Sequence, residues 1–393
     1  MNAGSNRTAG ILTLPQAGLL WGIGVYLRLP MLLVAPLTPQ LTASLRLNAT
    51  HIDSLLTLPL VLLGGGALFS ARIVRLLNPW RALVLGLAVV GCGSAARVWI
   101  PTFAVLLGWT ALFGLGVALL QVALPVYLRD RALDVARATA IYTNGLLVGE
   151  VLVTASTPAL AHVLGAGWRL AFLLWTSPLF VLLGLFLFTG GRAGHAPAGA
   201  ADHGTGRAWS SSVRLGVIMS GSASMYFAAN GYLPRVLDLS GQGGLIAPGL
   251  GVLNGAQLLA SVWLIWLGGR ALRGVAHLLG FALCACAGLA GLLLLSAGWA
   301  DLPLAGVCGF GTAGMLTLVL SRATHTGDAH TSRQVVSRTL FVGYTLAFVL
   351  PSFGGWLADR SGWPAAALLP PLLWGLVGVA LLAAEAVRPP LRE

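Results

Sequence analysis

Apolar runs long enough to cross a membrane alternate with short polar stretches along almost the whole chain. Cutting the sequence at charges, prolines and turn residues gives twelve apolar segments. They cover residues 14–41, 52–74, 79–99, 101–128, 138–163, 168–189, 213–237, 245–269, 273–297, 300–322, 335–357 and 363–386. Because about 20 apolar residues of helix span the hydrocarbon core of a bilayer, each segment predicts one transmembrane helix. The pattern therefore predicts an all-α integral membrane protein with twelve transmembrane helices.

The segments form two sets of six, separated by a stretch of different composition. Residues 192–212, RAGHAPAGAADHGTGRAWSSS, are rich in Gly, Ala, Pro and His and have no apolar period. Residues 157–179 and 350–373 occupy matching places in the two sets, and both contain a Pro, a Gly-Trp pair and a following apolar helix. This echo predicts two pseudo-symmetric six-helix bundles, 1–191 and 213–393, joined by the linker 192–212, with a substrate path between them.

Composition supports a membrane protein and gives its expected orientation. The chain is 57% hydrophobic and 9% charged, with a mean hydropathy of +0.87, which is far more apolar than a soluble protein. The net charge of +12 does not predict a nucleic-acid partner, because the arginines lie mostly between the apolar segments instead of forming a basic face. Most of them fall in alternate loops, which predicts that both termini and the linker are cytoplasmic. The short polar N-terminus, MNAGSNRTAG, shows no removable signal peptide.

Several chemistries have no support in the sequence. The four cysteines lie within apolar segments, which favours packing roles over disulfides or metal ligands. The seven histidines show no metal-ligand spacing, and without any lysine there is no P-loop for ATP. A membrane enzyme needs Asp, His or Ser clustered near one face, and here such residues are scattered. We therefore expect no cofactor, no metal and no enzymatic activity.

Arg28 is the single charge of segment 14–41, which we expect to form one long helix with Arg28 near its middle. A guanidinium at the bilayer centre costs about 2.5–3.5 kcal/mol on the translocon scale. Such a charge normally faces a partner, a cavity or a ligand. In one interpretation Arg28 binds an anionic or strongly dipolar substrate through its planar fork. In the other it pairs permanently with an internal acid and only ties helices together.

Glu150 is the one acid well inside an apolar segment of the first half. Thr139, Thr143, Thr154 and Thr157 share its helix face, so this polar stripe should face the bundle interior. Glu150 is either a proton carrier, with substrate and proton competing for the site, or the static ion-pair partner of Arg28 or Arg97. The sequence leaves both interpretations open.

Uncharged polar residues complete the candidate substrate site. Each can hydrogen-bond a substrate, or it can join helices through bonds worth about 0.6–2 kcal/mol. The candidates are Gln121 and Tyr142 in the first half, and Tyr226, Asn230, Gln257 and Tyr344 in the second, with Asn254 beside them.

Several short stretches together resemble the cyanate and 2-nitroimidazole transporter group of the major facilitator superfamily. They are Leu27-Arg28-Leu29-Pro30, SLLTLPLVLLGG (54–65), GLGVALLQVALPVYLRDR (114–131), Ala140-Ile141-Tyr142, Gly167-Trp168-Arg169, Tyr232-Leu233-Pro234 and GYTLAFVLPSFGGWLADRSGW (343–363). The chain departs from the superfamily between the second and third segments. There the family normally has an Asp followed by Arg and Gly, whereas SARIVRLLNPWRAL (70–83) has arginines but no acid.

The resemblance implies a secondary active transporter that works by alternating access in the plasma (inner) membrane of a bacterium. Its expected cargo is a small polar or anionic organic solute of the cyanate, nitroimidazole or carboxylate kind, with or without coupling to protons. The alternative is a multidrug-type proton antiporter that exports small aromatic compounds. We expect a monomer whose partners are the solute, membrane lipid and, where coupling exists, protons.

Overall fold

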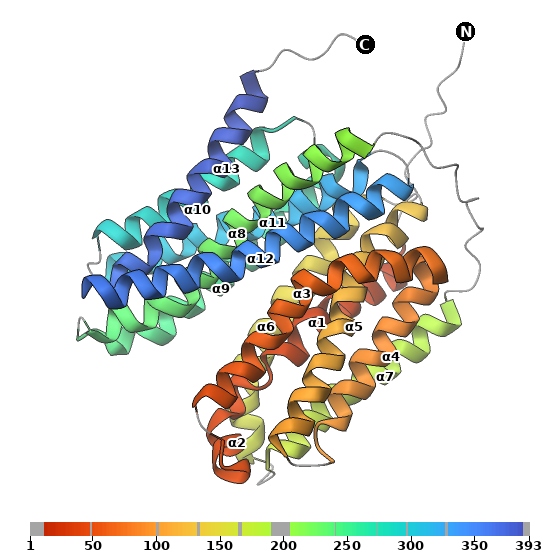
Figure 1. Cartoon of the computed structure of the whole chain (residues 1–393), viewed down its shortest axis with the longest axis horizontal. Helices are drawn as coiled ribbons and strands as arrows, with labels where there is room; N and C mark the ends of the chain where they lie inside the picture. The colour runs from red at the N-terminus through yellow and green to blue at the C-terminus, as the bar shows by residue number, and fades with distance from the viewer. Residues whose placement is uncertain are drawn as a thin grey trace.

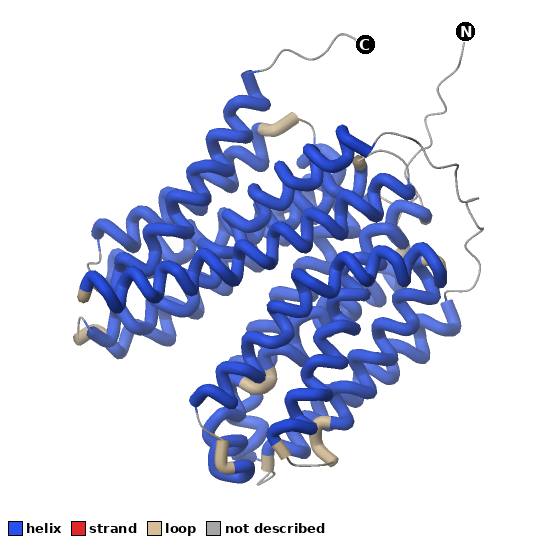
Figure 2. Tube along the Cα trace, in the orientation of Figure 1, coloured by secondary structure: helices blue, strands red, loops and turns tan. Residues whose placement is uncertain are grey.

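The computed structural model describes residues 12–47, 49–99, 102–131, 134–163, 167–189, 205–239, 241–272, 274–295, 298–326 and 329–387. Within these ranges every regular element is a helix and no strand occurs (Figure 2). The predicted polar N-terminus and residues 192–204 of the predicted linker lie outside the described residues. The all-α prediction is confirmed.

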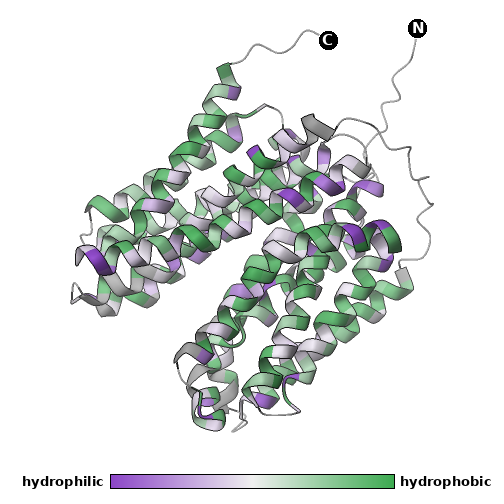
Figure 3. Ribbon diagram, in the orientation of Figure 1, coloured by the Kyte–Doolittle hydropathy of each residue, from purple (hydrophilic) through white to green (hydrophobic). Residues whose placement is uncertain are grey.

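Twelve long helices correspond one to one with the twelve predicted segments. They are α1 (Leu14–Leu32), α3 (Ala49–Leu77), α4 (Pro79–Ala96), α5 (Phe103–Asp130), α6 (Val135–Val163), α7 (Trp168–Thr189), α8 (Thr205–Leu239), α9 (Ile246–Leu267), α10 (Ala276–Leu295), α11 (Asp301–His325), α12 (Ala329–Ser361) and α13 (Leu369–Val387). A short helix, α2 (Thr38–Leu45), follows α1. Hydrophobic residues cover most of the length of these helices (Figure 3).

Ten of the twelve long helices contain a stretch that is long and apolar enough to cross a membrane, and the two others are α6 and α8. These two helices bury more polar side chains than a lipid-facing helix would. Thr139, Thr143 and Glu150 are buried on α6, and Ser222 and Tyr226 on α8. Their lower hydropathy therefore comes from residues that face protein instead of lipid.

The first predicted helix is interrupted, so the expectation of one continuous helix over 14–41 is wrong. α1 ends at Leu32, a 3-10 turn covers Ala35–Leu37, and α2 begins at Thr38. Pro36 and Pro39 explain the break, because proline has no N–H to donate and its ring clashes with the preceding turn. Arg28 consequently lies near the end of α1 instead of its middle.

The same helix pairs recur in each half of the chain. In the first half α1 packs on α6, α5 on α3 and α4, and α4 on α7. In the second half α8 packs on α12, α11 on α9 and α10, and α10 on α13. Figure 1 shows the resulting two six-helix bundles side by side. α8 already begins at Thr205, within the predicted linker; the boundaries at 191 and 213 stay predictions.

The two bundles meet mainly at one face, which we call the linker face because α7 ends there at Thr189 and α8 begins there at Thr205. Their contacts run between α3 and α12 and between α6 and α9. Ser337 Oγ donates to the Ala67 carbonyl at 2.7 Å, and Asn144 Nδ2 donates to Ser261 Oγ at 2.8 Å. Away from this face the bundles diverge, toward α2 and the start of α13 (Figure 1). The chain is thus closed at the linker face.

Candidate functional site

Glycines bring α1 and α6 into backbone contact and set the level of the two intramembrane charges. A β-carbon added to Gly149 would lie 2.6 Å from the Val25 carbonyl oxygen, and one added to Gly24 would overlap a carbonyl oxygen of α6. Small residues allow such close approach between membrane helices. Arg28 lies one turn beyond Gly24, and Glu150 follows Gly149 directly. The two ionisable side chains therefore lie at the same height, at the middle of α6.

A hydrogen-bond network across the bundle interface is centred on Tyr226. The Tyr226 hydroxyl is bonded to Glu150 Oε1, and both side chains are buried. The same hydroxyl lies 3.0 Å from Asn254 Oδ1 and accepts from Asn230 Nδ2 at 3.0 Å. Gln257 Nε2 donates to Asn254 Oδ1 at 2.9 Å. One residue of the first bundle is thereby joined to four of the second.

The hydrogen bonds that Tyr226 can make depend on whether Glu150 is protonated, because the Tyr226 hydroxyl has only one hydrogen to donate. Tyr226 has one hydroxyl hydrogen and two acceptors in reach, Glu150 Oε1 and Asn254 Oδ1. If Glu150 is ionised, Tyr226 donates to one acceptor and the other bond is lost. If Glu150 is protonated, it donates to the Tyr226 oxygen, and Tyr226 is free to donate to Asn254. With the Asn254 amide oriented so that its oxygen faces Tyr226, the protonated carboxyl allows both bonds together.

Arg28 is buried beside this network with only 5% of its surface exposed. Its guanidinium lies 5.4 Å from the centre of the Phe227 ring, a cation–π contact of roughly 0.5–2 kcal/mol. The charge of Glu150 acts on it electrostatically. Its Nε makes no hydrogen bond with the described residues. Arg28 thus keeps a buried donor in a cavity lined by residues of both bundles.

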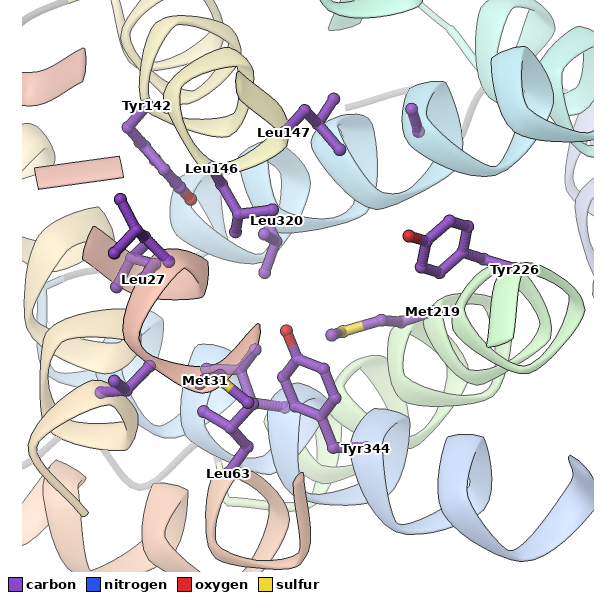
Figure 4. Close-up of a cluster of buried hydrophobic side chains, with 14 of the residues drawn as sticks. Leu27, Met31, Leu63, Tyr142, Leu146, Leu147, Met219, Tyr226, Leu320 and Tyr344 are labelled. Carbon is purple, nitrogen blue, oxygen red and sulfur yellow. The ribbon is translucent and has the colours of Figure 1, made fainter. Parts of the chain in front are cut away.

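Two small cavities gather the predicted site residues. Arg28, Tyr226, Gln257 and Tyr344 line a cavity of about 20 Å³, and Gln121, Tyr142 and Tyr344 line one of about 10 Å³. Tyr344 is common to both. The hydroxyl groups of Tyr142, Tyr226 and Tyr344 point into the space between the helices (Figure 4). Each cavity holds about one water, so an organic solute fits here only after the bundles separate.

The eight residues predicted for substrate and proton binding thus come together, with Asn230 and Glu150 joined through Tyr226. Their functional roles stay predictions. Thr139, Thr143 and Thr157 are buried, as the polar stripe predicted, and the side chain of Thr154 lies outside the description.

Sequence reasoning missed two neighbours of the site. Phe227, the ring under Arg28, lies within an apolar run and gave no signal. Asn144 accepts from Trp21 Nε1 at 2.9 Å and donates to Ser261 across the bundle interface. Asn144 could have been identified from the sequence, because it is an amide inside an apolar segment, six residues before Glu150.

Arg97, the other predicted partner of Glu150, lies in a separate place. Its fully buried guanidinium lies between the rings of Phe113 and Phe172, 4.4 and 4.5 Å from their centres. Its Nη2 donates to the Pro30 carbonyl at 3.1 Å and to Ser94 Oγ at 2.9 Å. Pro30 is two residues beyond Arg28 near the end of α1. Arg97 therefore holds the end of the helix that carries Arg28.

Comparison with known proteins agrees with this architecture. The family model described as Major Facilitator Superfamily matches residues 20–350. The chain is 29% identical over 376 residues to the 2-nitroimidazole transporter of Escherichia coli (strain K12), covering 92% of this chain and 91% of that protein. It is 26% identical over 357 residues to the cyanate transport protein CynX of the same organism, covering 86% and 89%. The crystal structure of the transporter FucP in the outward conformation superposes with a TM-score of 0.75 at 13% identity, covering 96% of this chain and 100% of that one, which shows a shared fold.

Proposed function

Because this chain belongs to the Major Facilitator Superfamily, we propose that it moves a small polar or anionic organic solute across the plasma membrane by alternating access. Membership of a transporter superfamily and the two related transporters confirm the resemblance predicted from the sequence. The chain is an integral membrane protein. The class of solute, its binding residues and the coupling ion are the proposal.

The proposed solute class rests on one observation, the buried position of Arg28 between the two bundles. Arg28 is a buried cation between two bundles, its Nε has no acceptor among the described residues, and tyrosine and amide groups surround it. A planar guanidinium binds carboxylate, nitro or small linear anionic groups through paired hydrogen bonds. The related transporters are named for cyanate and for a nitro-heterocycle, which are of this kind. We assign Arg28 the anionic or dipolar end of the solute, with Gln121, Tyr142, Tyr226, Asn230, Gln257 and Tyr344 around the remainder.

We propose that the linker face is cytoplasmic, because arginines concentrate in the loops on that side. Both termini then lie in the cytoplasm of a bacterial cell, and the described conformation is closed to the cytoplasm. The contacts of α3 with α12 and of α6 with α9 must then break to release solute inward. Rocking of two similar bundles about the central site accomplishes this exchange.

Glu150 is the proposed proton carrier, and the hydrogen-bond count around Tyr226 supports it. For an anionic solute we propose cooperation instead of competition between solute and proton. An ionised Glu150 repels an anion placed on nearby Arg28, whereas a protonated Glu150 does not. Each ligand therefore favours binding of the other. Such positive coupling between the binding of the anion and the binding of the proton corresponds to symport of the two.

Counterflow into liposomes tests the proposal. Purified protein is reconstituted and screened with small carboxylates, cyanate and nitro-heterocycles. We expect saturable counterflow for at least one of them, lost in Arg28→Gln and kept in Arg270→Gln, which removes an arginine on the linker face. Absence of counterflow for the whole panel by folded wild-type protein contradicts the proposed solute class.

One observation favours the second candidate, an antiporter for small aromatic compounds. The rings of Phe227, Tyr226 and Tyr344 line the cavity that holds Arg28. If stacking on these rings supplies the affinity, Arg28→Gln retains transport of aromatic compounds and Phe227→Ala loses it. The paired variants separate the two functions in one assay.

A further inference from the structure

A cleft lined by arginines opens between the two bundles at the linker face. It has a volume of about 230 Å³ and lies between α3 and α12. Arg72 and Arg75 of α3 line one wall, and Arg333 and Arg338 of α12 line the other. The central solute site does not include any of these residues.

The charges of this cleft differ from those of a second basic pocket on the same face. In that pocket, of about 440 Å³, Arg214 and Arg322 lie 3.0 and 3.6 Å from the carboxylate oxygens of Glu385. The protein supplies its own anion there. The lining of the cleft between α3 and α12 consists of four arginines, two uncharged polar residues and two apolar residues. No acidic residue is among these lining residues. Asp130 of α5 acts on Arg333 from outside the lining.

The position of the cleft makes its positive charge relevant to conformation. Beside it, Ser337 of α12 donates to the Ala67 carbonyl of α3 at 2.7 Å, one of the bonds that close the linker face. Closure brings arginines of both bundles together, and like charges repel. An anion between them turns this repulsion into attraction across the interface. The closed conformation therefore gains most from such a ligand.

We propose that this cleft binds a phosphate-class anion, which bridges Arg72 and Arg75 to Arg333 and Arg338 and stabilises the conformation closed at the linker face. Guanidinium groups bind phosphate through charge-assisted, paired hydrogen bonds. Arg72 and Arg75 are exposed, so the anion reaches the cleft from the membrane surface. Two sources supply this chemistry, an anionic phospholipid headgroup and inorganic phosphate. Basic pockets between transmembrane helices are suited to such headgroups.

The test measures thermal unfolding of the full-length protein and does not use transport. One arm adds inorganic phosphate to delipidated protein in a neutral detergent, against chloride at equal ionic strength. The other compares nanodiscs of phosphatidylcholine with and without phosphatidylglycerol. We expect the ligand to raise the unfolding temperature of wild type by roughly 2–4 °C. Arg72→Gln/Arg338→Gln should lose this rise.

Matched variants distinguish the cleft from general basicity and from the solute site. Arg81→Gln/Arg270→Gln removes the same charge from the linker face outside the cleft lining and should keep the rise. Arg28→Gln should also keep it, so failure of the solute hypothesis leaves this result intact. If the double variant does not fold, the exposed single variant Arg72→Gln replaces it, with at least half of the rise lost.

The two arms identify the source of the anion. A rise with phosphate alone assigns a soluble anion, and a rise with phosphatidylglycerol alone assigns a lipid headgroup. The proposal is overturned if neither ligand stabilises wild type more than chloride or phosphatidylcholine does. It is equally overturned if the cleft variants respond as strongly as wild type.

Discussion

Tyr226 of α8 is hydrogen-bonded to Glu150 of α6, and this bond joins the two bundles at the level of Arg28. Both side chains are buried, so bulk water reaches neither of them without a movement of the bundles. Protonation of Glu150 changes which bonds Tyr226 can make. A single proton thereby alters the contact between two halves that must separate during transport.

Replacing Glu150 by Gln should remove the proton dependence of transport. The amide fills the same volume and still bonds the Tyr226 hydroxyl, but it neither gains nor loses a proton. We expect solute uptake that no longer responds to an imposed pH gradient, with protein yield close to wild type. The measurement is uptake into liposomes with and without the gradient. If uptake by Glu150→Gln still depends on the pH gradient as in wild type, Glu150 is not the proton carrier.

Removing the Tyr226 hydroxyl should weaken the link between the bundles. In Tyr226→Phe the hydroxyl that bonds Glu150 and accepts from Asn230 is removed, whereas Asn254 Oδ1 keeps its bond from Gln257. Loss of a buried hydrogen-bond partner costs about 1–3 kcal/mol. We expect a lower unfolding temperature and a displaced pH profile of uptake. Tyr26→Phe is the matched control, because it removes a buried hydroxyl that bonds the Trp175 carbonyl, outside both this network and the proposed solute site. Equal pH profiles in the two variants would contradict a special role for Tyr226.

Arg28→Ala should strongly weaken solute binding while leaving membrane insertion intact. The loss of charge-assisted hydrogen bonds of about 1.5–3 kcal/mol corresponds to roughly 10- to 150-fold in Kd. Insertion becomes easier, because the charge is costly in the bilayer. Binding is measured by ligand-dependent thermal stabilisation, and folding by size-exclusion chromatography. If Arg28→Ala instead unfolds and Glu150→Gln restores it, the two residues are a static ion pair.

The sequence was sufficient to predict the helices. It also named polar residues that the structure brings together between the bundles, although their roles in binding stay predictions. An apolar run is a direct consequence of the lipid environment, so all twelve segments could be located. The partners of those polar residues depend on tertiary packing. Nothing in the segment around Phe227 indicates that its ring lies under Arg28. Likewise Gly149 shows its purpose only once the Val25 carbonyl is seen against it.

Gly149→Ala should destabilise the first bundle. The added β-carbon would lie 2.6 Å from the Val25 carbonyl oxygen, so α1 must move away from α6. Overpacking of this kind typically costs about 1–3 kcal/mol. The control is Gly184→Ala on α7, where an added β-carbon meets no atom within 4 Å. Thermal unfolding of the two variants should separate them; similar unfolding temperatures would show that close packing of α1 on α6 is not required.

Arg97→Met tests whether Arg97 positions α1 for solute binding. Methionine keeps an unbranched stem between the Phe113 and Phe172 rings, but it cannot donate to the Pro30 carbonyl. The end of α1 should then shift, and Arg28 with it, so the KM for solute should rise while kcat stays within a few-fold of wild type. Gly288→Ala on α10, where an added β-carbon would overlap the Cys308 backbone nitrogen, provides a destabilised reference that leaves Arg97 and α1 unchanged. A fall in unfolding temperature with KM unchanged would reduce Arg97 to a purely structural residue, whereas a raised KM that Arg97→Lys partly restores would identify its hydrogen bond to Pro30 as the contact that places Arg28.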